Sequence, residues 1–105
     1  MEKHLFVVFT NAKDGRDEEF NEWYDKQHVG DVLKVPGIVS CKRFELSEFQ
    51  RPTPHPYKYM AIYEIETDNL KEVSDEVSRR VGTPVMPRSD ALDTNIETHF
   101  YQPRD

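Results

Sequence analysis

The chain has 105 residues and a formal net charge of −6, from 20 acidic and 14 basic side chains. This acidic balance argues against nucleic acid and against an anionic membrane surface as partners, because both recruit basic residues. The length predicts one domain over residues 1–105, and a single cysteine with no long apolar run near the start predicts a cytoplasmic protein without an intrachain disulfide.

The first half of the chain predicts a strand, a helix and another strand. A short run of β-branched and aromatic residues from His4 to Thr10 is typical of a buried strand. Asp17 is placed to cap a helix that extends to about Lys34, where a Pro-Gly pair ends it. Residues 38–49 then predict a long strand.

The second half predicts a strand, a helix, a long loop and a final strand. Residues 57–66 predict a strand because their aromatic and apolar side chains fall on one face. Residues 67–81 predict an amphipathic helix, and residues 95–102 predict the last strand. The loop over residues 82–94 is long for so small a domain, and such loops often form or cover a functional site.

The predicted order is β-α-β-β-α-β, the ferredoxin-like arrangement of an α+β protein. In this arrangement a four-stranded antiparallel sheet carries both helices on one face. The second strand presents Phe44 and Leu46 on one side and Val39 and Cys41 on the other, so both faces of the sheet need cover. We therefore expect a homodimer in which two sheets pack face to face.

The first predicted helix carries polar groups on the side that should be buried. At 100° per residue, one face begins with aromatic residues and ends with polar ones. Its members are Phe20, Trp23, Tyr24, Gln27, His28 and Asp31. Asp31 falls about 20° from Phe20, where an unpaired carboxylate would be costly. Asp31 is therefore paired, neutral or beside a cavity, unless the helix ends near Gly30 and leaves the carboxylate in solvent.

The polar end of this face supplies the candidate catalytic residues His28, Tyr24 and Asp31. A histidine with a pKa of about 6.5 can act as acid or base at neutral pH, and a nearby carboxylate would fix its tautomer. A wall suited to a planar apolar substrate would be formed by Trp23, Phe20 and Gln27. The structural alternative is that the rings pack in the core and the histidine is half-buried and hydrogen-bonded.

The segment from Phe20 to Leu46 resembles the EthD-like branch of the dimeric α/β-barrel superfamily. The shared pattern is F-x-x-W-Y-x-x-x-H on a helix, then V-P-G, then a strand that carries an arginine. The matching positions are Phe20, Trp23, Tyr24, His28, Val35, Pro36, Gly37 and Arg43. The resemblance implies a homodimer whose sheets form a barrel, with a pocket between sheet and helices in each subunit. It implies a small, often cofactor-free enzyme, in which His28 corresponds to the histidine of the pattern.

Other chemistry has little support in the sequence. Arg43 lies in the middle of a predicted strand, where it either pairs with an acid such as Glu64 or anchors a substrate carboxylate or phenolate. The four histidines are dispersed and Cys41 is alone, so no metal site is predicted. No glycine-rich phosphate loop or G-x-S-x-G nucleophile occurs, so we expect no cofactor and no covalent nucleophile.

The leading hypothesis is a cofactor-independent enzyme that acts on a small apolar molecule of aromatic or polyketide-like character. His28 would be the general acid/base, Asp31 would orient it and Tyr24 would bind a substrate oxygen. The reaction would be of the isomerase, lyase or monooxygenase type, because one scaffold hosts all three. The alternative is a non-catalytic protein that binds a metabolite in the same pocket. A third interpretation is a structural dimer in which the polar residues of the helix are all internally hydrogen-bonded.

Overall fold

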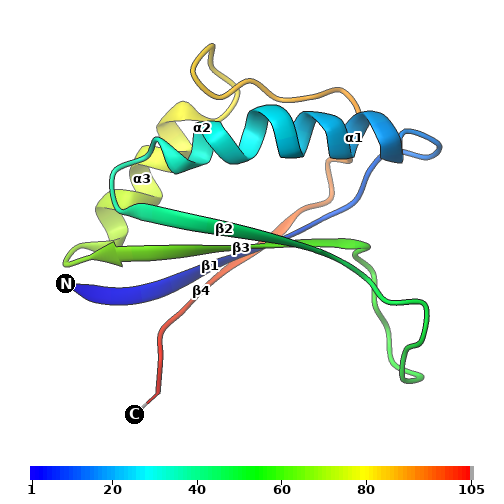
Figure 1. Cartoon of the computed structure of the whole chain (residues 1–105), viewed down its shortest axis with the longest axis horizontal. Helices are drawn as coiled ribbons and strands as arrows, with labels where there is room; N and C mark the ends of the chain where they lie inside the picture. The colour runs from blue at the N-terminus through cyan, green and yellow to red at the C-terminus, as the bar shows by residue number, and fades with distance from the viewer. Residues whose placement is uncertain (105) are drawn as a thin grey trace.

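The computed structural model describes residues 1–104 and consists of a four-stranded sheet with helices on one face (Figure 1). Its elements are β1 (Glu2–Thr10), α1 (Asp17–Trp23), η1 (Tyr24–His28), α2 (Val29–Leu33), β2 (Ile38–Glu45), β3 (Tyr59–Thr67), α3 (Leu70–Arg80) and β4 (Glu97–Tyr101). The strand order is β2-β3-β1-β4, and neighbouring strands are antiparallel. The predicted ferredoxin-like βαββαβ fold is therefore confirmed. Within residues 1–104, no helix is long and apolar enough to cross a membrane.

The ends of the predicted strands differ from the observed ones by a few residues. β2 ends at Glu45 rather than Phe49, and β3 begins at Tyr59 rather than Tyr57. The chain between these strands contains three prolines, which cannot donate the hydrogen bonds of a sheet ladder. This composition accounts for the earlier exit from β2 and the later entry into β3.

Asp17 does not cap the first helix, contrary to the prediction. Arg16 occupies the cap position, and Asp17 is the first residue of α1. The Asp17 carboxylate instead accepts hydrogen bonds from the Tyr59 hydroxyl at 2.6 Å and the Lys58 ammonium at 3.1 Å. These bonds hold the start of α1 against the start of β3 and lower the pKa of Asp17.

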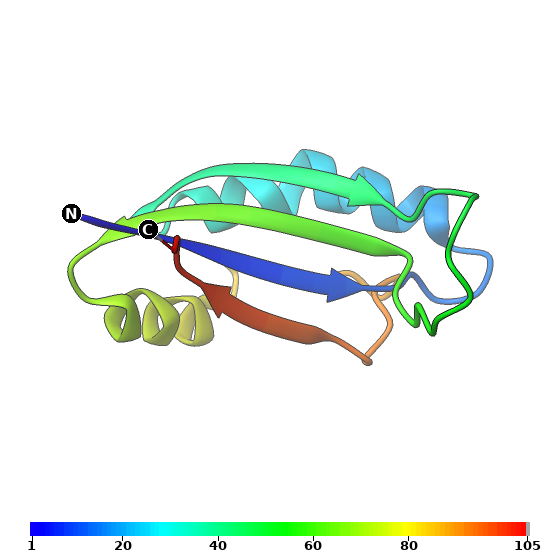
Figure 2. The same cartoon turned by 90° about the horizontal axis from the view of Figure 1, so that it is seen from below.

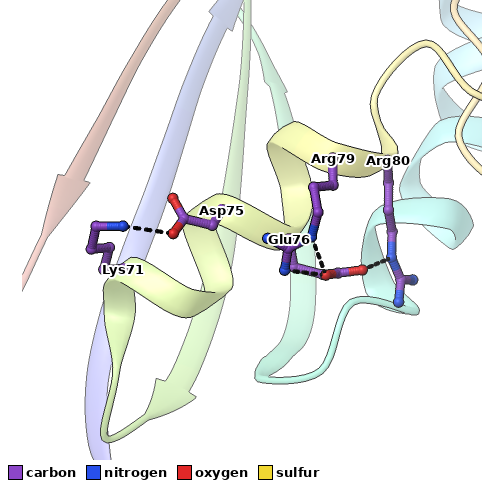
Figure 3. Close-up of polar contacts among 5 residues, drawn as sticks. All are labelled: Lys71, Asp75, Glu76, Arg79 and Arg80. Carbon is purple, nitrogen blue, oxygen red and sulfur yellow. Dashed lines mark hydrogen bonds and ion pairs between the residues drawn. The ribbon is translucent and has the colours of Figure 1, made fainter.

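α3 combines a capped start with ion pairs along its surface. The Asn69 side chain accepts a hydrogen bond from the Glu72 amide at 3.2 Å, which caps the helix. Figure 3 shows the polar pairs that follow, which are Lys71–Asp75, Glu76–Arg79 and Glu76–Arg80. Ion pairs near the surface add little to stability, so α3 is held mainly by its apolar side.

The core lies between the sheet and the helices. Alternate residues of β3 face the helices and are almost inaccessible to solvent, as the sequence predicted: Tyr59, Ala61, Tyr63 and Ile65. The helical side contributes Phe20, Tyr24, Val32, Val35 and Val73. Two residues of the 82–94 loop, Met86 and Ala91, are fully buried against them. The loop is therefore part of the core and not a loose connection.

The turn between α2 and β2 requires glycine. Gly37 has a φ of +98°, which L side chains rarely adopt. A Cβ at this position would lie 3.0 Å from Val73 Cγ2, and the Gly37 carbonyl accepts a hydrogen bond from the Glu66 amide at 2.8 Å. The elements α1, η1 and α2 follow one another without a gap and form the first long helix. The turn therefore brings this helix, α3 and the sheet together at one point.

The opposite face of the sheet has no helix over it (Figure 2). The register places Leu5 and Phe9 of β1, Ile62 of β3, Phe44 of β2 and Tyr101 of β4 on this side. Leu5, Phe44 and Tyr101 are 36%, 38% and 54% exposed. The structure contains one chain, so the homodimer that would cover this face stays a prediction.

Candidate functional site

A π-helical turn interrupts the first long helix at the predicted site. It extends from Tyr24 to His28, and the Val29 amide donates to the Tyr24 carbonyl five residues earlier. Such a turn holds one more residue than an α-helical turn and is frequent at functional sites. The extra residue rotates the following part of the helix by about 100° relative to a regular α-helix.

The rotation changes which side chains face the sheet. In a regular helix Val32 would lie about 120° from Phe20, on the solvent side. Val32 is instead 3% exposed and faces the interior beside His28. Asp31 is buried at 6% exposure, so the alternative in which the helix ends near Gly30 and leaves the carboxylate in solvent is wrong. Asp31 does not face the same space as His28.

His28 lines a cavity of about 420 Å³ between the helices, the sheet and the 82–94 loop. Most of the wall is apolar and comes from β1, β3, the first helix, α3 and the loop. The main contributors are Phe6, Val8, Trp23, Tyr24, Val32, Tyr63, Val77, Met86 and Leu92. A cavity of this size and composition is typical of sites for small organic molecules.

The His28 ring is held by aromatic contacts and has no hydrogen bond within residues 1–104. It stacks on Trp23 at a centroid distance of 4.6 Å and meets the Tyr24 ring edge-on at 4.9 Å. Nδ1 is enclosed and unpartnered, so Nε2 is the nitrogen that a ligand can reach. Burial lowers the pKa of His28 to about 4; Asp31 opposes this change, and Arg43 and Arg88 add to it. The imidazole is therefore neutral at pH 7.

Two phenols lie beside the imidazole. The Tyr63 hydroxyl donates to the Tyr24 hydroxyl oxygen at 3.3 Å, and both side chains line the cavity. Burial raises the pKa of Tyr24 to about 12 and also raises the pKa of Tyr63. Tyr24 is therefore protonated at neutral pH and can donate a hydrogen bond to a ligand oxygen. Burial also raises the pKa of the Cys41 thiol, which leaves it a poor nucleophile.

Arg43 lies beneath Tyr24 and outside the cavity. Its guanidinium donates to Asp25 Oδ1 at 2.7 Å and to Asn21 Oδ1 at 2.9 Å, and it does not pair with Glu64. The guanidinium carbon is 4.2 Å from the centroid of the Tyr24 ring, a cation–π contact. Arg43 therefore packs against the back of the Tyr24 ring. It does not line the cavity, so it is not placed to anchor a ligand there.

Gln27 and Asp31 form a separate polar pair on the side of α2 that faces α3. The Gln27 amide donates to Asp31 Oδ2 at 2.7 Å. Arg79 and Arg80 lie on the same side but are bound to Glu76 (Figure 3). Of the predicted site residues, the structure brings together His28, Tyr24 and Trp23 at one cavity. Phe20 is fully buried in the core behind them.

Arg88 is the functional candidate that the sequence did not identify. It lies in the 82–94 loop and lines the cavity of its own chain. The loop is fixed there by the buried side chain of Met86 and by a hydrogen bond of 3.3 Å from Trp23 Nε1 to the Pro87 carbonyl. The unusual length of the loop was the only signal in the sequence, and it did not mark this residue. Within residues 1–104, no three His, Cys, Asp or Glu side chains are grouped as a metal ion would require.

Comparison with known proteins identifies the fold. No family model matches the chain, and no curated protein matches it by sequence. Solved structures that resemble it include a variant of SnoaB, a cofactor-independent oxygenase from Streptomyces nogalater, with a TM-score of 0.68, 16% identity and coverage of 100% of this chain and 96% of that one. An EthD family protein from Bacillus halodurans gives a TM-score of 0.54 with 15% identity, over 99% of this chain and 100% of that one.

A third resemblance is to the heme degrader MhuD from Mycobacterium tuberculosis, whose structure has two hemes bound in its active site. The TM-score is 0.62 with 13% identity, and the match covers 95% of this chain and 94% of that one. At such low identity these matches establish the fold alone. The chain has the ferredoxin-like fold of these proteins, and an EthD family protein is among them, in agreement with the resemblance found in the first helix.

Proposed function

We propose that this protein is a cofactor-independent enzyme that removes a proton from a small, planar, largely apolar molecule, with His28 as the base. The observation that carries the proposal is a neutral imidazole without a hydrogen bond, held inside a largely apolar cavity of about 420 Å³. Proton transfer requires only a positioned acid or base, which the chain itself supplies. The fold shared with a cofactor-independent oxygenase supports the same conclusion.

In this mechanism the substrate proton moves from a C–H or O–H group to Nε2 of His28. The Tyr24 hydroxyl donates a hydrogen bond to the substrate oxygen on which negative charge develops. A buried imidazolium alone is unfavourable, and burial is why the pKa of His28 is low. The imidazolium forms, however, at the same moment as a substrate anion beside it, and attraction between opposite charges is strong in a site of low dielectric.

The fate of the substrate anion decides the type of reaction. Return of the proton from His28 to a different substrate atom gives an isomerase, and loss of a leaving group gives a lyase or cyclase. Reaction of an electron-rich ring anion with dioxygen gives a monooxygenase, and here the substrate itself must be able to reduce dioxygen. The resemblance to SnoaB favours the last of these three.

A homodimer through the uncovered face of the sheet is part of the proposal. This face carries Leu5, Phe44, Ile62 and Tyr101 beside charged residues such as Lys42 and Glu64, and Leu5, Phe44 and Tyr101 are each at least 36% exposed. A second copy of the same chain can bury it by a symmetric contact, because the surface then meets itself. Each subunit keeps its own cavity, since the cavity lies on the opposite side of the sheet.

The proposal is tested by hydrogen–deuterium exchange into candidate substrates. The protein is incubated in D₂O with a panel of phenols, quinones, hydroxy acids and lactones, and deuterium incorporation and new products are measured by mass spectrometry. The matched variants are His28→Gln and His55→Gln, the latter on an exposed loop. We expect His28→Gln to reduce exchange or turnover by about 100-fold or more, while His55→Gln has no effect.

Two results would contradict the proposal in different ways. Full exchange and turnover by His28→Gln would remove His28 as the base. Stoichiometric binding of a ligand by the wild-type protein, without exchange or product, would favour the non-catalytic binding protein instead.

A further inference from the structure

The cavity carries a positive charge in a protein that is acidic overall. The formal net charge of the chain is −6. Within residues 1–104, no aspartate or glutamate lines the cavity, and Arg88 is its one permanently charged side chain. Because His28 is neutral at pH 7, the charge of the empty cavity is that of the Arg88 guanidinium. An apolar wall with one cation suits an apolar ligand with one negative group.

We propose that Arg88 makes this cavity selective for planar apolar molecules that carry a single oxyanion, as a carboxylate or a phenolate. This inference rests on the proposed function, because it names the class of substrate that His28 would deprotonate. The oxyanion binds Arg88 at the open side of the cavity, and the apolar ring occupies the interior beside Trp23 and His28.

Arg88 is available for such a ligand. It forms no ion pair or hydrogen bond with any residue in the range 1–104, whereas the nearby Arg16 binds Glu19, and Arg79 and Arg80 bind Glu76. Its side chain is exposed to solvent although it lines the cavity, which places it at the mouth. Because the Arg88 guanidinium is exposed and has no acid partner, an anion can bind it without first breaking an existing ion pair.

The backbone that carries Arg88 is fixed in position. Pro87 precedes it, and the Pro87 carbonyl accepts the hydrogen bond from the Trp23 indole at 3.3 Å. The Met86 side chain is fully buried, and the Met86 carbonyl accepts from the Gly82 amide at 2.9 Å. Trp23 also stacks on His28, so one indole links the proposed anion-binding residue to the proposed base. A ligand anion at Arg88 is therefore held at a defined place relative to His28.

The proposal also accounts for how His28 responds to its surroundings. The Arg88 cation contributes to the low pKa of His28, after burial and Arg43. A bound oxyanion would neutralise this contribution and raise the pKa of His28 toward its ordinary value. Binding of the correct substrate would thus make the imidazole a stronger base than it is in the empty cavity.

The test uses isothermal titration calorimetry to compare planar ligands of different charge, of which the first two share one shape. The ligands are 2-naphthoate, the neutral 2-naphthamide, and 2,4-dinitro-1-naphthol, which is a phenolate at neutral pH. The proteins are wild type, Arg88→Gln, Arg88→Lys and the control Arg51→Gln, on an exposed loop. We expect wild type to bind at least one anion about fivefold more tightly than the amide, a difference that falls at high salt. For each anion, the affinity lost in Arg88→Gln shows whether Arg88 binds the carboxylate, the phenolate or both.

Arg88→Gln should remove the preference, and Arg88→Lys should retain part of it, because lysine keeps the charge but not the planar fork. Arg51→Gln should bind as wild type does. Equal affinity for all three ligands, or a preference that survives Arg88→Gln, would overturn the inference and leave the proposed function intact, since the apolar cavity still binds. Failure of all three ligands to bind wild type would overturn the inference and also remove the cavity as a site for planar apolar molecules.

Discussion

The burial of His28 predicts a specific loss of stability in acid. The folded-state pKa of about 4 lies below the unfolded value of about 6.5, so the unfolded chain binds a proton over this range that the folded chain does not. Stability therefore begins to fall as the pH drops through about 6.5 and stops falling below about 4. One pKa unit corresponds to about 1.4 kcal/mol, which gives a loss of about 3 kcal/mol at pH 4.

Urea unfolding of wild type, His28→Gln and His55→Gln between about pH 7.5 and pH 4 measures this loss. Other titrating groups contribute equally to all three proteins, so the relevant quantity is the difference between wild type and His28→Gln at each pH. We expect this difference to shift against wild type by about 3 kcal/mol, whereas the difference between wild type and the exposed-loop control stays nearly constant. A change of less than about 1 kcal/mol would mean that His28 titrates normally, and the argument for a neutral buried base would fail.

Three further predictions concern the supports of the site and the assembly. Arg43→Gln should lower the free energy of unfolding by about 2 kcal/mol in a thermal scan, because the bonds to Asp25 and Asn21 and the contact with Tyr24 are lost. The control Arg51→Gln should have no such effect. Gly37→Ala should cost about 2 kcal/mol in urea unfolding, more than Gly15→Ala, because both glycines have a positive φ but only at Gly37 would the new methyl group approach another side chain. In sedimentation velocity, Phe44→Lys should convert a dimer to a folded monomer. The control Phe49→Lys, on the neighbouring loop, should remain a dimer. A Phe44→Lys protein that sediments as a dimer would place the interface elsewhere.

The fold could be predicted because its signals are local and repetitive. The alternation of Tyr59, Ala61, Tyr63 and Ile65 defines the buried face of a strand, and the apolar spacing around Val73 defines the buried side of a helix. Both patterns follow the structural repeat of the backbone, so they can be recognised without knowing which residues pack against them. The order of elements then leaves few ways to form one sheet.

The site could be predicted only in part, because its geometry depends on tertiary contacts. A regular helix with 100° per residue places Asp31 on the same face as His28, but the π turn rotates Asp31 toward α3. Nothing in the residue types marks where such a turn occurs. The partner of Arg43 is an acid on the helix and not on a neighbouring strand, because the side chain crosses beneath Tyr24. Arg88 joins the cavity only when its loop folds back over the first helix, and no local pattern records that contact.

The stacking of Trp23 on His28 gives the protein an internal optical reporter. Trp23 is the one tryptophan in the sequence, so all indole emission originates at the wall of the cavity. A protonated imidazole in van der Waals contact with an excited indole accepts an electron from it, whereas a neutral imidazole does so poorly. The emission of the native protein should therefore dim when His28 gains a proton, so that the charge state of one ring can be followed in real time during ligand binding and turnover, without any added label.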